Sequence, residues 1–134
     1  MVDVLVPVDG SSGSKNALEC AFDIFPNARF HVVHVLQVTE ISSDPAVSSL
    51  ELARERAGEI IEEASSIADA HERSIETAIV RGNASRAIVR YAEENDVDHV
   101  VIGSDGRSGI RRVLLGSVAE TVARRSPTPV TIVR

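Results

Sequence analysis

Residues 97–117 read VDHVVIGSDGRSGIRRVLLGS, an apolar run followed by a glycine-rich loop that ends where a helical pattern begins. Two residues separate Gly103 from Gly106, and nine more lead to the pair Gly116-Ser117. A loop that leaves a strand and ends at the start of a helix can surround an anion with backbone N–H groups. The glycine-rich loop is therefore a candidate anion site.

Two other phosphate-binding motifs do not fit this chain. Its only lysine is Lys15, which follows Ser14, so there is no GxxxxGK sequence. Gly103, Gly106 and Gly109 do not have the spacing of GxGxxG either. A purely structural interpretation stays open, because glycines also mark flexible surface turns that need a positive φ.

Apolar runs and helical periodicities alternate along the whole chain. This alternation, with nearly continuous apolar strands, is typical of an α/β fold with a doubly wound parallel five-stranded sheet and helices on both faces. Right-handed crossovers favour the strand order 3-2-1-4-5 in a single domain over 1–134. Strands are predicted at 3–8, 29–36, 74–81, 97–102 and 129–133, and helices at about 17–25, 46–72, 84–95 and 117–125.

The predicted strand order also predicts where a ligand binds. In such sheets ligands lie outside the carboxyl ends of the strands, at the switch point between the first and fourth strands. Asp9 follows the first predicted strand and Gly103 follows the fourth. We therefore expect these two residues to meet at one site, although they are far apart in the sequence.

Composition excludes several classes of protein. The net charge of −6 argues against a nucleic-acid partner, because phosphates favour a basic surface. No apolar run approaches the ~20 residues of a membrane span, and the opening MVDVLVPVD has no basic region typical of a signal peptide. The single cysteine, Cys20, excludes an intrachain disulfide. We expect a cytoplasmic protein that contacts neither a membrane nor nucleic acid.

Neither a zinc site nor a catalytic set can be assembled from the sequence. His31 and His34 are three residues apart on a predicted strand, so their side chains point to opposite faces and one metal ion cannot take both. Cys20 has no adjacent base or CxxC partner, which favours a packing role. No Ser-His-Asp set or pair of catalytic carboxylates stands out, so no catalytic residue is assigned.

Four segments together resemble the universal stress protein family over essentially the whole chain. They are VPVDGS at 6–11, HVVHVL at 31–36, the glycine loop, and PVTIVR at 129–134. The resemblance implies a Rossmann-like domain. In the ATP-binding branch of the family, the aspartate after the first strand and the valine of the second line the adenosine, while the loop and its serine hold the phosphates. The predicted binding residues, matched by position, are Pro7, Asp9, Val35, Ile102, Gly103, Gly106, Arg107, Gly116, Ser117 and Val118.

The resemblance implies a cofactor as well: ATP or another adenine nucleotide, with Mg²⁺ or Mn²⁺. Arg107, Arg111 and Arg112 form the densest positive patch of the chain and would compensate phosphate charge, unless they are simply solvated. The family often has histidine or arginine where this chain has Asp105. An acid at that position would either repel a triphosphate or help to hold a divalent cation.

Two of the candidate binding residues also have structural explanations. SVAE at 117–120 has the pattern of a capping box, which predicts Ser117 as the N-cap of the last helix and Glu120 as its N3 residue. A capped helix N-terminus remains able to bind an anion. Asp9 precedes Gly10, a common turn pair, but its place at the switch point favours a ribose hydroxyl as its partner.

The function that these features favour is a nucleotide-binding regulatory protein of the stress response. A slow metal-dependent ATPase is the first alternative, and a nucleotide-free, chaperone-like dimer is the second. The enzyme is less favoured, because the chain lacks a P-loop lysine and an obvious residue to activate water. The nucleotide-free dimer is less favoured, because the glycine loop has the spacing found in the family.

A homodimer is predicted through the last strand, 129–133. This strand should lie at the edge of the sheet and has no charge before Arg134, so a bare edge would invite association. Antiparallel pairing with a second copy would satisfy its open hydrogen bonds, and Thr131 is expected to be the central donor. The resemblance implies the same contact. A short edge strand protected by a neighbouring helix is the alternative.

Overall fold

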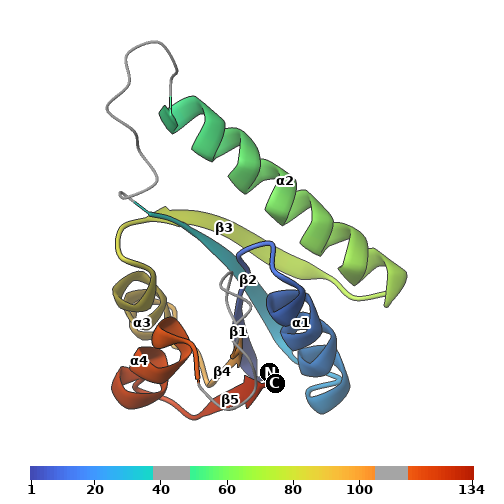
Figure 1. Ribbon diagram of the computed structural model, residues 1–134. Helices are drawn as coiled ribbons and strands as arrows, with labels where there is room; N and C mark the ends of the chain where they lie inside the picture. The colour runs from blue at the N-terminus through green and yellow to red at the C-terminus, as the bar shows by residue number, and fades with distance from the viewer. Residues whose placement is uncertain (38–48, 105–114) are drawn as a thin grey trace.

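The computed structural model describes residues 1–37, 49–104 and 115–134, which form a parallel sheet covered by helices (Figure 1). In these ranges no helix is both long and apolar enough to cross a membrane. The strands are β1 (Asp3–Pro7), β2 (Arg29–Leu36), β3 (Ile75–Arg81), β4 (His99–Gly103) and β5 (Val130–Val133), and the helices are α1 (Ser12–Ile24), α2 (Ser49–Ala70), α3 (Ala84–Glu94) and α4 (Ser117–Arg125).

The sheet has the order β3-β2-β1-β4-β5 and all of its strand pairs are parallel. Helices α1 and α2 cover one face, and α3 and α4 cover the other (Figure 1). The predicted fold class and strand order are therefore confirmed. Several boundaries differ, chiefly the start of α1, which is Ser12 and not about 17, and the start of β4, which is His99 and not 97. The N–H of Val97 instead donates to the carbonyl of Ala92 (3.0 Å) and closes the end of α3.

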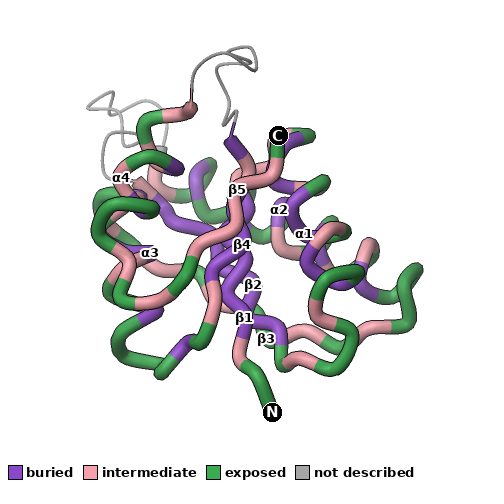
Figure 2. The backbone as a smooth tube through the Cα atoms, turned by 90° about the horizontal axis from the view of Figure 1, so that it is seen from below, coloured by how far each residue is buried: buried purple, intermediate pink, exposed green. Residues whose placement is uncertain are grey.

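The core is aliphatic and divided by the sheet into two layers. The central strands β1 and β4 are buried on both faces, as expected of a parallel sheet between helices (Figure 2). On the α1/α2 side, Phe22 and Phe30 pack edge to face with ring centroids 4.9 Å apart. The α3/α4 side is built from Leu5, Val33, Val35, Ala84, Ala87, Ile88, Ala92, Val97, Val100, Ile102, Ala119 and Val122.

The sheet opens between β1 and β4 at a proline. The paired register of these strands extends to Leu5 and Val100, whereas β1 stays paired with β2 as far as Pro7. The N–H of Asp98 donates to the carbonyl of Asp3 (2.8 Å), so Asp3 faces β4. Peptide groups alternate in direction along a strand, so Pro7 faces β4 too, where it has no N–H to extend the ladder. A crevice at the carboxyl end of β1 follows from this sequence.

The lack of a side chain at Gly103 allows the first turn of α1 to lie directly on the end of β4. A β-carbon at Gly103 would lie 2.7 Å from both the carbonyl carbon and the carbonyl oxygen of Gly13, and 3.1 Å from the nitrogen of Ser14. No side chain fits against backbone at that distance. Gly103 is therefore required by the packing of α1, whatever its part in ligand binding.

The peptide groups of β5 are oriented in the opposite way to the prediction, in which Thr131 donates at the open edge. The N–H of Val100 donates to the carbonyl of Pro129 and the N–H of Ser104 donates to that of Val133, both at 3.0 Å. Peptide groups alternate in direction along a strand, and Thr131 is two residues from each of these acceptors. The peptide groups of Thr131 therefore face β4 as well. The expectation that Thr131 donates at the open edge is wrong. The residues whose peptide groups face the edge are Val130 and Ile132.

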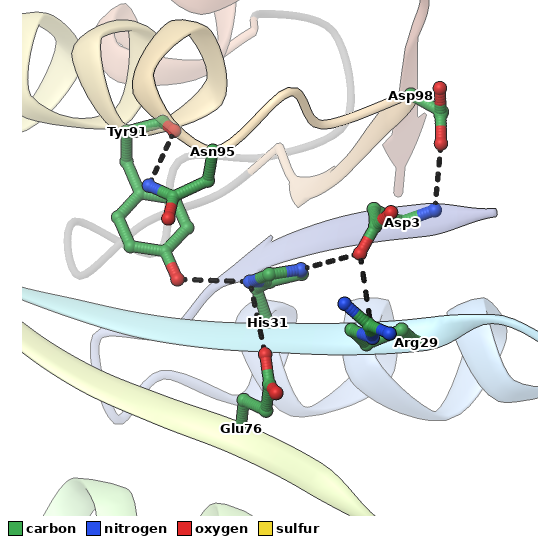
Figure 3. Close-up of polar contacts among 7 residues, drawn as sticks. All are labelled: Asp3, Arg29, His31, Glu76, Tyr91, Asn95 and Asp98. Atoms are coloured by element: carbon green, nitrogen blue, oxygen red, sulfur yellow. Dashed lines mark hydrogen bonds and ion pairs between the residues drawn. The ribbon is translucent and has the colours of Figure 1, made fainter. Parts of the chain in front are cut away.

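His31 and His34 lie on opposite faces of β2, as the strand period predicts. His31 contacts α3, where its Nδ1 lies 2.9 Å from the hydroxyl of Tyr91, and its Nε2 lies 2.9 Å from Asp3 Oδ1 (Figure 3). Burial raises the pKa of the Tyr91 hydroxyl, and the charges of Glu76 and Asp3 raise it further. The hydroxyl thus keeps its proton at neutral pH. Nδ1 also lies 3.6 Å from Glu76 Oε2, so both ring nitrogens of His31 are engaged by polar groups of the protein.

His99 is expected to make the stability of the fold depend on pH. Its Nε2 lies 2.7 Å from Thr131 Oγ1, and its ring packs on Phe25 with centroids 4.8 Å apart. Burial lowers the pKa of His99 below its ordinary value, so the unfolded chain takes up this proton at a higher pH than the folded chain does.

We therefore expect the free energy of unfolding to fall as the pH drops through about 6.5, the ordinary pKa of histidine. Urea unfolding at a series of pH values measures the effect in the wild type and in His99→Gln, which retains a side chain able to hydrogen-bond Thr131. The difference between the two curves isolates His99 from the other histidines. Parallel curves would contradict the assignment.

Candidate functional site

A cavity of about 560 Å³ opens at the carboxyl ends of the central strands, where the strand order predicts a ligand. Segments from β1, β2 and β4 and from the starts of α1, α3 and α4 surround it. Its described lining residues are Pro7, Val8, Asp9, Ser11, Ser14, Val33, His34, Val35, Gln37, Ala84, Ile88, Ile102, Gly103, Ser104, Leu115, Gly116, Ser117, Val118, Ala119 and Glu120.

One part of the cavity is apolar. Val35 at the end of β2, Ala84 and Ile88 on α3, and Ile102 on β4 contribute small or branched aliphatic side chains. All four are buried and also belong to the core layer beneath α3 and α4. Their positions are therefore fixed by packing, and they form a preformed wall suited to a flat apolar group.

Asp9 stands between this wall and the start of α1. Its Oδ1 accepts a hydrogen bond from the N–H of Ser11 (2.9 Å), and its own N–H donates to Ser14 Oγ (3.3 Å). Ser11 is the N-cap of α1, since its hydroxyl accepts from the N–H of Ser14 (3.2 Å). Asp9 therefore has a fixed backbone and one anchored oxygen. Its other oxygen makes no hydrogen bond within the described part of the chain and is able to accept from a ligand.

The N-terminus of α4 lies at the cavity, and it is not capped as the sequence suggested. The N-cap is Gly116, whose carbonyl accepts from the N–H of Glu120 (3.0 Å) and which has no side chain with which to cap the helix. Ser117 is the first helical residue, so the predicted capping box is wrong: Glu120 comes one position too late to close it. The N–H groups of Ser117, Val118 and Ala119 have no intrahelical acceptor and lie at the positive end of the helix dipole.

The base of the glycine loop is tied to the edge strand. The N–H of Gly116 donates to the carbonyl of Ser104 at 2.7 Å, and the N–H of Ser104 donates to the carbonyl of Val133 at 3.0 Å. Ser104 itself is 2% exposed. The amide of Gly116 is thus already used, and its contribution to the site is to hold the start of α4 beside β4 and β5.

The charges that the described lining residues carry are two carboxylates, Asp9 and Glu120. Glu120 lies in the first turn of α4 and accepts a hydrogen bond from Arg124 at 2.9 Å, an exposed contact one helical turn away. Within the ranges that the structure covers, no group of three histidines, cysteines or acids is placed to hold a metal ion. An anion in this cavity would be held by backbone N–H groups and by the dipole of α4.

Most of the predicted binding residues meet at this cavity. Gly106 and Arg107, like Asp105, Arg111 and Arg112, lie outside the described residues. The sequence did not single out His34, Ala84 or Ile88 as lining residues. Helical periodicity marks Ala84 and Ile88 as buried, but only the three-dimensional arrangement tells which buried residues reach the cavity. The predicted residues that line it are Pro7, Asp9, Val35, Ile102, Gly103, Gly116, Ser117 and Val118.

Comparisons with known proteins agree with this geometry. The model of the "Universal stress protein family" matches residues 1–134. Universal stress protein MJ0531 of Methanocaldococcus jannaschii is 31% identical, over 98% of this chain and 81% of that protein. The solved structure of the hypothetical protein MJ0577 of the same organism has a TM-score of 0.82 at 28% identity, covering 98% of this chain and 94% of that one. A universal stress protein solved in complex with cAMP has a TM-score of 0.76 at 33% identity, covering 99% and 97%.

Proposed function

This chain belongs to the universal stress protein family, and on that premise we propose that it binds an adenine nucleotide in the cavity at the carboxyl ends of β1, β2 and β4. The observation that carries the proposal is the N-terminus of α4, whose first N–H groups have no acceptor within the helix and lie at one end of an otherwise mostly apolar cavity. A relative of 33% identity was solved with cAMP, which supports a ligand of this class.

Each part of a nucleotide has a counterpart among the lining residues. The base fits the aliphatic wall of Val35, Ala84 and Ile88, where burying a flat ring is favourable. The ribose hydroxyls would donate to the available oxygen of Asp9. The phosphate would accept from the N–H groups at the start of α4 and from the Ser117 hydroxyl.

ATP carried with Mg²⁺ or Mn²⁺ is the form that the family resemblance favours, and the predicted loop residues Gly106 and Arg107 would contact its outer phosphates. The protein would then act by reporting the nucleotide to a partner or through its own dimer. Slow ATP hydrolysis and a nucleotide-free, chaperone-like role remain the competing functions. A phosphate-release assay separates the first of these from simple binding.

Methyl NMR tests the proposed site directly. Adding AMP to the methyl-labelled protein is expected to shift the signals of Val35, Ile88, Ile102 and Val118, because a bound adenine ring changes the magnetic environment of the walls it touches. The methyl groups of Ile24, at the far end of α1, and of Leu52 on α2 are exposed and do not line the cavity, so they serve as internal controls. Shifts centred on the controls, or none at saturating AMP, would contradict the proposal.

We also propose a homodimer through the open edge of β5. The strand occupies the edge of the sheet, its residues are only half-buried, and it carries no charge between Val130 and Val133. Pairing with a second copy about a two-fold axis would use the outward peptide groups of Val130 and Ile132.

Ile132→Pro is expected to shift the protein to monomer, because it removes an outward N–H while leaving the inward ladder to β4 complete. Ile132→Val is the matched control, since it has a similar side chain and retains the N–H. Sedimentation velocity at tens of micromolar, roughly where a weak dimer persists, measures the distribution. A wild-type monomer, or a dimer that survives Ile132→Pro, would contradict this interface.

A further inference from the structure

His34 is a buried polar residue that lines the cavity but is not one of the proposed nucleotide contacts. Its side chain lies on the opposite face of β2 from His31, is 3% exposed, and belongs to the lining of the cavity. Its Nδ1 lies 2.8 Å from the carbonyl oxygen of Val8. A carbonyl only accepts, so Nδ1 carries the hydrogen and donates it.

The partner of this hydrogen bond is the last peptide before Asp9. β1 ends at Pro7, but the N–H of Val8 still donates to the carbonyl of Val33 (2.8 Å), which extends the ladder to β2 by one bond. The carbonyl of Val8 is then held by the imidazole of His34. Both polar groups of Val8 are thus fixed to β2, one through backbone and the other through a side chain.

Asp9 is consequently held from both sides. On its C-terminal side the start of α1 anchors it, through Ser11 N–H to Oδ1 (2.9 Å) and through its own N–H to Ser14 Oγ (3.3 Å). On its N-terminal side the anchor is the carbonyl of Val8, and the only side chain among the described residues that bonds it is His34. The Val8 carbonyl belongs to the peptide unit that joins Val8 to Asp9, so rotating it would turn Asp9.

We propose that His34 is a positioning residue for ribose recognition: its Nδ1–H bond to Val8 holds the Asp9 carboxylate where it meets the ribose hydroxyls. This inference rests on the proposed nucleotide site. Without the donor, a buried carbonyl loses its partner and the Val8–Asp9 peptide turns to find another, since an unpaired buried carbonyl is costly. The apolar wall and the α4 N-terminus are left unchanged.

The role predicts a loss confined to ligands with ribose hydroxyls. Calorimetric titration compares AMP with 2′,3′-dideoxy-AMP, which keeps the base and the phosphate. His34→Leu is expected to weaken AMP roughly tenfold and to leave the dideoxy ligand unchanged. His34→Asn places an amide N–H near the position of Nδ1 and is expected to restore most of the AMP affinity. His34→Met is a second variant without the donor, for use if the leucine variant does not fold.

A double-mutant cycle with Asp9→Ala identifies the route of the effect. If His34 acts through Asp9, then His34→Leu costs nothing further for AMP once Asp9 is alanine. Equal losses for the two ligands, or additive losses in the cycle, would overturn the positioning role and leave the nucleotide site standing. A wild-type protein that binds neither ligand would contradict the proposed function itself, and this inference with it.

Discussion

Replacing Ser117 with proline is expected to weaken AMP binding by roughly 10- to 100-fold without loss of fold stability. Ser117 is the first helical residue of α4, a position where proline is well accepted because the N–H has no partner within the helix. Gly116 before it has φ −62° and ψ 150°, an extended conformation that a following proline permits. The substitution therefore removes one phosphate donor and one hydroxyl from the proposed site and leaves the helix intact.

Ser117→Ala separates the two donors, because it removes the hydroxyl and retains the N–H. We expect it to lose less affinity for AMP than Ser117→Pro, and we expect adenosine, which has no phosphate, to respond to neither. Thermal unfolding monitored by circular dichroism verifies the fold of both variants. An unchanged AMP affinity in Ser117→Pro would place the phosphate away from the start of α4.

Gly103→Ala is expected to lower the free energy of unfolding by about 1–3 kcal/mol, the usual cost of overpacking a tight contact. The added β-carbon would lie 2.7 Å from the backbone of Gly13, and backbone moves less easily than a side chain. The first turn of α1 must then shift away from β4, and with it the anchors of Asp9. Urea unfolding measures the loss.

Gly58→Ala is the control for this prediction, because a β-carbon at Gly58 meets nothing within 4 Å and alanine favours the helix α2. We expect that variant to be as stable as the wild type or more so. If Gly103→Ala were equally stable, the close approach of α1 to β4 would not be a constraint on this fold.

The strand order was predictable from the sequence because it depends on a pattern that extends over the whole chain. Five apolar runs alternating with helical periodicities leave few arrangements, and the sheet has the one expected. The meeting of Asp9 and Gly103 at one cavity then follows from topology alone. The crevice itself has a visible cause in the sequence, since Pro7 has no N–H with which to extend the pairing of β1 with β4.

What the sequence did not reveal depends on single hydrogen bonds. SVAE at 117–120 has the letters of a capping box, but the helix starts one residue earlier than that motif requires, since the bond from Gly116 to Ser104 fixes its first turn. The orientation of the peptide groups in β5 is likewise set by its register with β4, which no periodicity specifies. The proposed role of His34 depends on the carbonyl of Val8, one residue beyond the end of β1.

The central claim is that the cavity at the carboxyl ends of β1, β2 and β4 binds an adenine nucleotide. Isothermal titration of the wild-type protein with AMP, and with ATP in Mg²⁺ or Mn²⁺, tests it most directly, with nucleotide removed beforehand by unfolding and refolding. We predict saturable binding of at least one of these ligands at one site per chain, and loss of that binding in Ser117→Pro. No detectable heat with any of them, or binding that is indifferent to Ser117→Pro, would contradict the account.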